Sequence, residues 1–193
     1  MLYNSDTLND YLAQENTQAF IKSAKSYIAF CEKLVKEPPS PLVLSKIQPF
    51  ISDIFLRAFS LERIFLEWPE EFQELGPEHD GVYQELVQFF KKSIGSDTRC
   101  VMVLKPYQVD QSYSSFFVNE LFTDLYLCLN DILYRIEVIA TPTEIQAALC
   151  FLWNEIANSW GPECASLIAA YSDKSSDVRK IAFNISGQNL NLN

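Results

Sequence analysis

Apolar residues recur at three- and four-residue spacings along most of this chain, a period typical of amphipathic helices. The first clear case runs from about Asn16 to Glu37. It stops at Pro38-Pro39, because proline has no amide hydrogen and disfavours helical backbone before it. A short helix over residues 7–14 is expected to lead into it.

A second and more apolar segment, from Ser40 to about Phe65, predicts a helix in the core. The Ser40 hydroxyl suits the cap of this helix and Pro41 its first position. Pro49 is expected to kink or delay the helix. An acidic connector over residues 66–80 follows.

Asp80 is placed to cap a further helix that ends near Ser93. The run over residues 99–104 is the one β-rich stretch. A lone strand would have no pairing partner, so we expect an extended segment that packs against helices and forms no sheet. The longest helix is predicted over residues 114–139, and its apolar positions are numerous enough for burial on two sides.

The last strong signals are helix boundaries. Thr141 and Glu144 form a capping box that opens a helix to about Ser159 or Trp160. Gly161 suits a left-handed C-cap there, and Pro162 then suits the start of a helix to about Tyr171. Beyond residue 175 an edge strand or docking arm with a frayed end is expected.

Together these elements predict an all-α fold, a compact single-domain bundle of about six or seven helices with a short extended segment near residues 99–104. Residues 1–175 would form the domain and residues 176–193 a C-terminal arm or frayed tail. A hydrophobic content of 48% over 193 residues is ample for one core.

The formal net charge is −10, and the 15 Lys and Arg residues are scattered along the chain. Nucleic acid and anionic membranes both need clustered basic residues, so neither is an expected partner. No signal peptide and no apolar run of about 18 residues is visible. The five cysteines are odd in number, form no C-x-x-C pair and sit mostly among apolar residues, which indicates reduced, buried thiols in a cytoplasm.

Candidate catalytic chemistry is sparse. The single histidine, His79, cannot supply a multi-histidine metal site, and no phosphate-binding glycine loop or nucleophile elbow is present. The sequence therefore predicts no cofactor, no metal site and no catalytic residue set.

One helical face gathers charge. Glu120, Asp124 and Asp131 share a face of the 114–139 helix, and Arg135 continues it by an ordinary salt-bridge step. Glu155 on the next helix could approach the same surface. Carboxylates on facing helices can hold Mg²⁺ or Mn²⁺, but ion pairs on a solvated face are the simpler expectation. Aromatic residues expected to line a cleft nearby are Tyr126, Trp153 and Trp160.

The second half resembles an uncharacterised bacterial family, domain of unknown function fifty sixty-three. The resemblance covers roughly residues 10–172. The residues that carry it are Thr123-Asp124-Leu125-Tyr126, Asn130-Asp131-Ile132-Leu133, Leu152-Trp153-Asn154-Glu155-Ile156 and Ser159-Trp160-Gly161. This resemblance implies a compact all-helical bundle from a bacterial cytoplasm and brings no assigned activity.

The chain departs from the family pattern at three points. Ser159 stands where the family tends to have histidine, and Glu163 stands where a second histidine is common. An acidic pair that often opens the long helix is reduced to Glu120. A site built from those histidines would be absent or altered in this chain.

Two functional hypotheses remain. The first is a non-enzymatic helical domain that acts through protein contacts or self-association, since the chain is rich in apolar and aromatic residues and lacks a catalytic set. The alternative is a divergent metal-dependent hydrolase of a phosphorylated small molecule that uses Glu120, Asp124 and Asp131 with Glu155.

Overall fold

The computed structural model describes residues 5–64, 66–71, 80–103 and 113–172. Within these ranges the chain forms seven α-helices, one π-helical turn and one two-stranded sheet. The predicted all-α bundle is therefore confirmed, with a small β element added. The helices are α1 (Ser5–Ala13), α2 (Glu15–Leu34), α3 (Val43–Phe59), α4 (Asp80–Ile94), α5 (Val118–Tyr134), α6 (Pro142–Asn158) and α7 (Trp160–Ser172).

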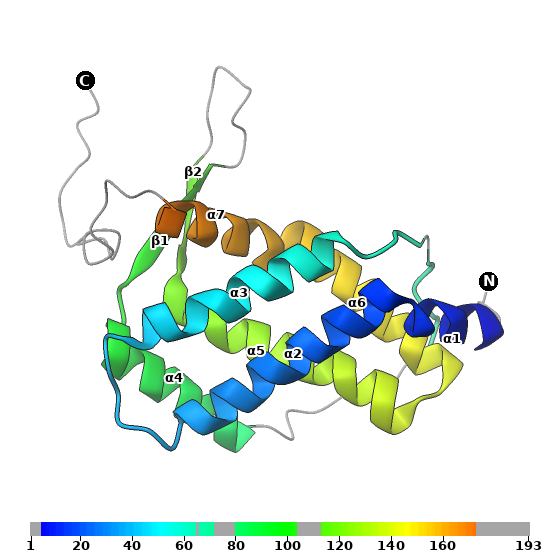
Figure 1. Cartoon of the computed structure of the whole chain (residues 1–193), viewed down its shortest axis with the longest axis horizontal. Helices are drawn as coiled ribbons and strands as arrows, with labels where there is room; N and C mark the ends of the chain where they lie inside the picture. Colours follow the sequence, from blue (N-terminus) through cyan, green and yellow to red (C-terminus); the bar gives the residue numbers. More distant parts are fainter. Residues whose placement is uncertain (1–4, 65, 72–79, 104–112, 173–193) are drawn as a thin grey trace.

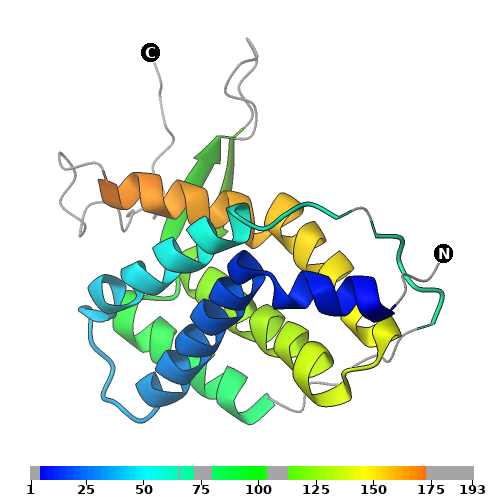
Figure 2. The same ribbon diagram turned by 45° about the vertical axis from the view of Figure 1, so that its right-hand side comes forward.

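Helix α5 is the centre of the bundle and packs against α2, α4, α6 and α7 (Figure 1). Burial on two sides, predicted from its apolar positions, is confirmed, since residues around most of its circumference are buried. The Tyr27 hydroxyl on α2 donates to the Phe122 carbonyl on α5 at 2.7 Å and ties the two helices inside the core. Helix α3 covers α2 and α7, while α1 lies against α6 (Figure 2).

The extended segment does have a pairing partner. Strand β1 (Arg99–Val103) pairs antiparallel with β2 (Tyr113–Phe117), and Arg99 lies opposite Phe117. The expectation of an unpaired extended segment was wrong, because the partner strand lies within residues assigned to the start of the long helix. That helix begins only at Val118, whose amide donates to the Thr98 carbonyl at 3.0 Å. The hairpin stands beside α7 at one edge of the bundle (Figure 1).

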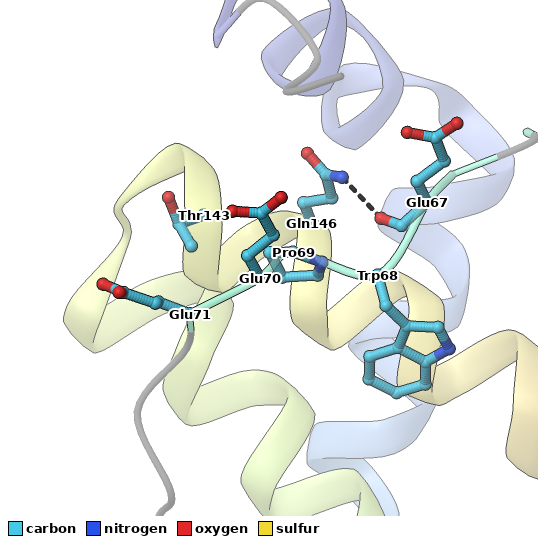
Figure 3. A pocket seen from close by; sticks show the side chains of 7 residues that line it. All are labelled: Glu67, Trp68, Pro69, Glu70, Glu71, Thr143 and Gln146. Carbon is cyan, nitrogen blue, oxygen red and sulfur yellow. Dashed lines mark hydrogen bonds between the residues drawn. The ribbon is translucent and has the colours of Figure 1, made fainter.

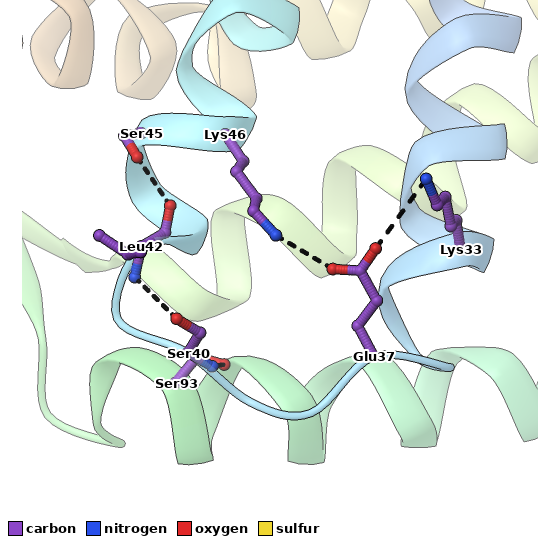
Figure 4. Close-up of polar contacts among 7 residues, drawn as sticks. All are labelled: Lys33, Glu37, Ser40, Leu42, Ser45, Lys46 and Ser93. Carbon is purple, nitrogen blue, oxygen red and sulfur yellow. Dashed lines mark hydrogen bonds and ion pairs between the residues drawn. The ribbon is translucent and has the colours of Figure 1, made fainter.

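The turn between α2 and α3 is held by polar side chains (Figure 4). The Ser40 hydroxyl accepts from the Leu42 amide at 3.3 Å, but the helix proper begins at Val43, two residues after Pro41. The Lys46 ammonium reaches Glu37 at 3.0 Å across the turn. Pro49 lies inside α3 and does not delay its start.

The junction of α6 and α7 has a different geometry from the one expected. Gly161 is not a left-handed cap: it is the second residue of α7, and Gly95 is the one glycine with positive φ in the described chain. A β-carbon at Gly161 would lie 1.9 Å from the Ile156 carbonyl oxygen. Glycine is needed here for a close approach of two backbones.

The junction of α5 and α6 follows the sequence more closely. Residues Arg135–Ile139 extend α5 as a π-helical turn, η1, and Ala140 then adopts φ of 52°. The Thr141 hydroxyl accepts from the Glu144 amide at 3.3 Å, and Pro142 occupies the first turn. The predicted N-cap at Thr141 is confirmed.

Candidate functional site

An apolar groove of about 560 Å³ lies where the end of α3 and the residues after it meet α6 and α7. This volume falls within the range of known ligand pockets. The groove is lined by Phe59, Leu61, Arg63, Trp153, Ile156, Ala157, Gly161, Pro162 and Ala165. The close backbone approach at Gly161 sets the distance between its α6 and α7 walls.

The wall opposite α6 and α7 is fixed from outside the groove. The Asn16 side-chain amide donates to the Ser60 carbonyl at 3.0 Å, and the Tyr11 hydroxyl donates to the Glu62 carbonyl at 2.9 Å. The Glu62 carboxylate accepts from the Gln14 amide nitrogen at 3.0 Å. These contacts come from α1, α2 and the residue between them, and they hold the residues after α3 that form this wall of the groove.

Arg63 is the one charged residue among the described residues that line the groove. Its guanidinium lies 5.9 Å from the centre of the Trp153 ring, in the range of a cation–π contact. No carboxylate in the described part of the chain lies within ion-pair distance of it. The groove thus combines apolar walls with one cation whose carboxylate-binding capacity is unused.

Exposed apolar side chains continue from the groove along α3. Phe59 is 61% exposed and Leu56, one turn earlier, is 66% exposed. The ring of Phe59 packs against that of Phe55, with centroids 4.6 Å apart. Exposed apolar surface that is contiguous in this way is a common feature of binding sites.

The predicted acidic face separates into two parts. In the first, Glu120 and Asp124 on α5 lie near Glu155 on α6, as expected. Loss of solvent, followed by the nearby charges of Glu120 and Glu155, raises the pKa of Asp124 to about 6. Glu163 on α7 joins them, and desolvation with the charge of Asp124 raises its pKa to about 7. We call these four residues the carboxylate cluster.

The carboxylate cluster has no compensating cation: across the described ranges, no Lys or Arg forms an ion pair with any of its four members. Tyr83 on α4 borders it, and its pKa is raised first by burial and then by the charge of Asp124. No three His, Cys, Asp or Glu side chains in the described residues are arranged to hold a metal ion. The cluster is a site of charge repulsion.

The second part of the face is an ion-pair network. Arg135 lies 2.9 Å from Asp131, the predicted i, i+4 partner, and also pairs with Glu144 in the first turn of α6. The Arg135 and Glu144 side chains are only 7% and 8% exposed. Asp131 is therefore engaged with Arg135 and does not face the carboxylate cluster.

The three predicted cleft residues separate as well. Trp153 lines the apolar groove, whereas Tyr126 and Trp160 are buried in the main core. Asp124 and Asp131 are thus not among the described residues that line the groove with Trp153. The Arg63–Trp153 contact could not be seen in the sequence, because the two residues lie ninety positions apart and no periodic pattern connects them.

A second hollow of about 550 Å³ lies between the connector and α6 (Figure 3). Its floor is tied down where the Gln146 amide nitrogen donates to the Glu67 carbonyl at 2.6 Å, and the Cys150 thiol reaches the same oxygen at 3.5 Å. It is lined by Glu67, Trp68, Pro69, Glu70, Glu71, Thr143 and Gln146. Three of these seven residues are acidic.

The remaining expectations fall in three groups. All five cysteines are buried, as predicted, and none of them forms a disulfide. Within the described residues, no helix has the length and apolarity that a membrane crossing requires. His79 and the predicted C-terminal arm lie outside the described residues.

The comparisons with known proteins agree with the fold. The solved structure of protein BF1032 from Bacteroides fragilis is similar, with a TM-score of 0.64 over 86% of this chain and 96% of that one, at 14% identity. No curated protein matches the chain. The family described as Domain of unknown function (DUF5063) matches residues 11–172, including both walls of the groove and the carboxylate cluster. The chain belongs to this family, as its helical motifs had indicated.

Proposed function

We propose that this domain acts by binding a segment of another protein in the groove between α3, α6 and α7, without chemistry of its own. The observation that carries the proposal is the continuity of apolar surface from the groove onto the exposed Phe59 and Leu56 of α3. Apolar grooves between helices commonly accept the apolar face of a partner helix or an extended segment.

The expected occupant is a different protein and not a second copy of this chain. Each chain carries a net charge of −10, so two copies repel one another at moderate salt. The five buried thiols, none of them in a disulfide, fit a reducing bacterial cytoplasm as the setting for this interaction.

A displayed library of random twelve-residue peptides tests the proposal. Ala157 lines the groove on the exposed side of α6, so Ala157→Glu should block the groove with little effect on folding. Ala29→Glu makes the same change on an exposed position of α2, away from the groove. Peptides enriched on the wild-type domain should bind Ala29→Glu equally well and Ala157→Glu at least roughly tenfold more weakly.

Two results would contradict the proposal. One is a set of selected peptides that bind the Ala157→Glu variant as well as the wild type. The other is sedimentation that shows a stable homodimer which dissociates on Ala157→Glu, because the groove would then serve self-association.

The alternative of a metal-dependent hydrolase receives support from one observation, the convergence of Glu120 and Asp124 with Glu155. It would have to use Glu163 in place of Asp131, because Arg135 already binds Asp131. Addition of Mn²⁺ or Mg²⁺ tests it: a rise in melting temperature that Glu163→Gln abolishes would favour the hydrolase over the binding module.

A further inference from the structure

We infer that the groove selects an apolar group carrying a carboxylate, with the Arg63 guanidinium as the anchor for that carboxylate. The inference rests on the proposed function, in which the occupant of the groove is a segment of a partner protein. The group would then be an Asp or Glu side chain that lies beside large apolar residues in that segment. The inference goes further by giving the chemistry that the groove recognises.

Arg63 has hydrogen-bond donors available for a carboxylate. A guanidinium offers five N–H donors in a planar fork that matches a carboxylate in two parallel hydrogen bonds. In this chain acidic residues outnumber basic ones by 25 to 15, yet no carboxylate of the described residues pairs with Arg63. The adjacent Glu62 carboxylate accepts from Gln14 instead.

Arg63 lies at the edge of an otherwise apolar surface. Its contact with the half-buried Trp153 ring restricts the guanidinium to one side of the groove. The other lining residues are apolar, so an occupant that covers them excludes water and strengthens any charge pair beside them. A carboxylate that enters together with an apolar side chain therefore binds more tightly than a carboxylate that enters alone.

The charge of the groove favours a carboxylate over other charged groups. A phosphate group carries nearly two negative charges and is usually held by several cations. The groove has one cation on a chain of net charge −10, which suits one single negative charge. An ammonium group would meet Arg63 as a like charge and is disfavoured.

The test uses 4-phenylbutyrate and its uncharged analogue 4-phenylbutanamide as probes of the full chain. Binding is followed by the backbone and indole ¹H–¹⁵N shifts of residues lining the groove. We expect the carboxylate to bind roughly three- to tenfold more tightly than the amide. The difference should vanish in Arg63→Met and persist in Arg57→Met, which removes an exposed α3 arginine paired with Asp53.

The outcomes separate this inference from the proposed function. Equal binding of both probes, blocked by Ala157→Glu, overturns the carboxylate preference and leaves the groove as a binding surface. Absence of shifts at the groove with either probe also overturns the inference, while the peptide selection decides the proposed function independently. A preference that survives Arg63→Met shows that another cation is the anchor and contradicts the assignment.

Discussion

Arg135 and Glu144 form a buried ion pair that joins the end of α5 to the first turn of α6. Asp131 approaches the same guanidinium from one turn earlier on α5, with its oxygen 2.9 Å from Arg135 Nε. The guanidinium thus lies between two carboxylates at the π-helical turn η1. Burial of such a group is tolerated only while its partners remain, because an isolated buried charge is strongly unfavourable.

Arg135→Met should therefore destabilise the domain by about 3 kcal/mol, since it leaves the buried Glu144 carboxylate without this cation. Urea denaturation followed by circular dichroism measures the change. Lys25→Met is the control, because it removes an ion pair with Glu137 that is largely exposed, at a cost of under about 1 kcal/mol. A similar loss in both variants would show that the burial of Arg135 has no energetic consequence.

Gly161→Ala should destabilise the protein by more than about 2 kcal/mol, because the new methyl group would overlap the Ile156 carbonyl and force α6 and α7 apart. The melting temperature measures the effect. Gly81→Ala is a matched control on α4, where a β-carbon meets nothing within 4 Å. That variant should be neutral or more stable, since alanine favours helix.

The carboxylate cluster predicts a dependence of stability on pH. Asp124 and Glu163 keep their protons to about pH 6 and pH 7 in the folded chain, because their pKa values are raised there. In the unfolded chain, Asp and Glu side chains lose their protons near pH 4. Between about pH 4 and pH 7 the folded chain therefore binds more protons than the unfolded chain. The free energy of unfolding consequently falls as the pH rises from 5 to 8.

Glu163→Gln should flatten this slope. We expect it to stabilise the domain at pH 8 by roughly 1 kcal/mol, a modest value because the carboxylates are partly hydrated, and to change little at pH 5. Glu85→Gln makes the same substitution on an exposed position of α4 and should leave the slope as it is. Melting curves at several pH values that show parallel behaviour for wild type and Glu163→Gln would contradict the prediction.

The five thiols should be unreactive in the folded protein. Burial raises the pKa of Cys31 to about 12 and raises the pKa of Cys128 and Cys164 still further. Thiolate is the reactive form, so Ellman's reagent should label no thiol within minutes until guanidinium unfolds the chain, when all five react. Rapid labelling of one thiol in the native protein would show that its surroundings open locally.

Local features of this fold were predictable from the sequence. The Thr141 cap and the Asp131–Arg135 pair each depend on residues within one turn, whose relative positions a helix fixes in advance. The burial of α5 on two sides followed from the number of its apolar positions. In each case the residues that form the sequence pattern are the same residues that make the structural feature.

Features that depend on distant segments were not predictable in this way. The pairing of β1 with β2, the approach of Gly161 to Ile156 and the arrival of Glu144 beside Arg135 all depend on how elements meet. A helical period predicts the direction in which a side chain points from its helix, but it does not predict which residue that side chain will contact. Arg63 carried no local signal, so its place in the groove emerged only from the fold.

The segment after α3 contributes to two surfaces at once. Leu61 and Arg63 form part of the groove, and Glu67 to Glu71 form part of the second hollow, where Gln146 donates a hydrogen bond to the Glu67 carbonyl. If a ligand in the groove moved this segment, the free energy of binding in the second hollow would change as well. Thermodynamic linkage makes that effect reciprocal, so occupants of the two surfaces would favour or oppose each other by the same factor.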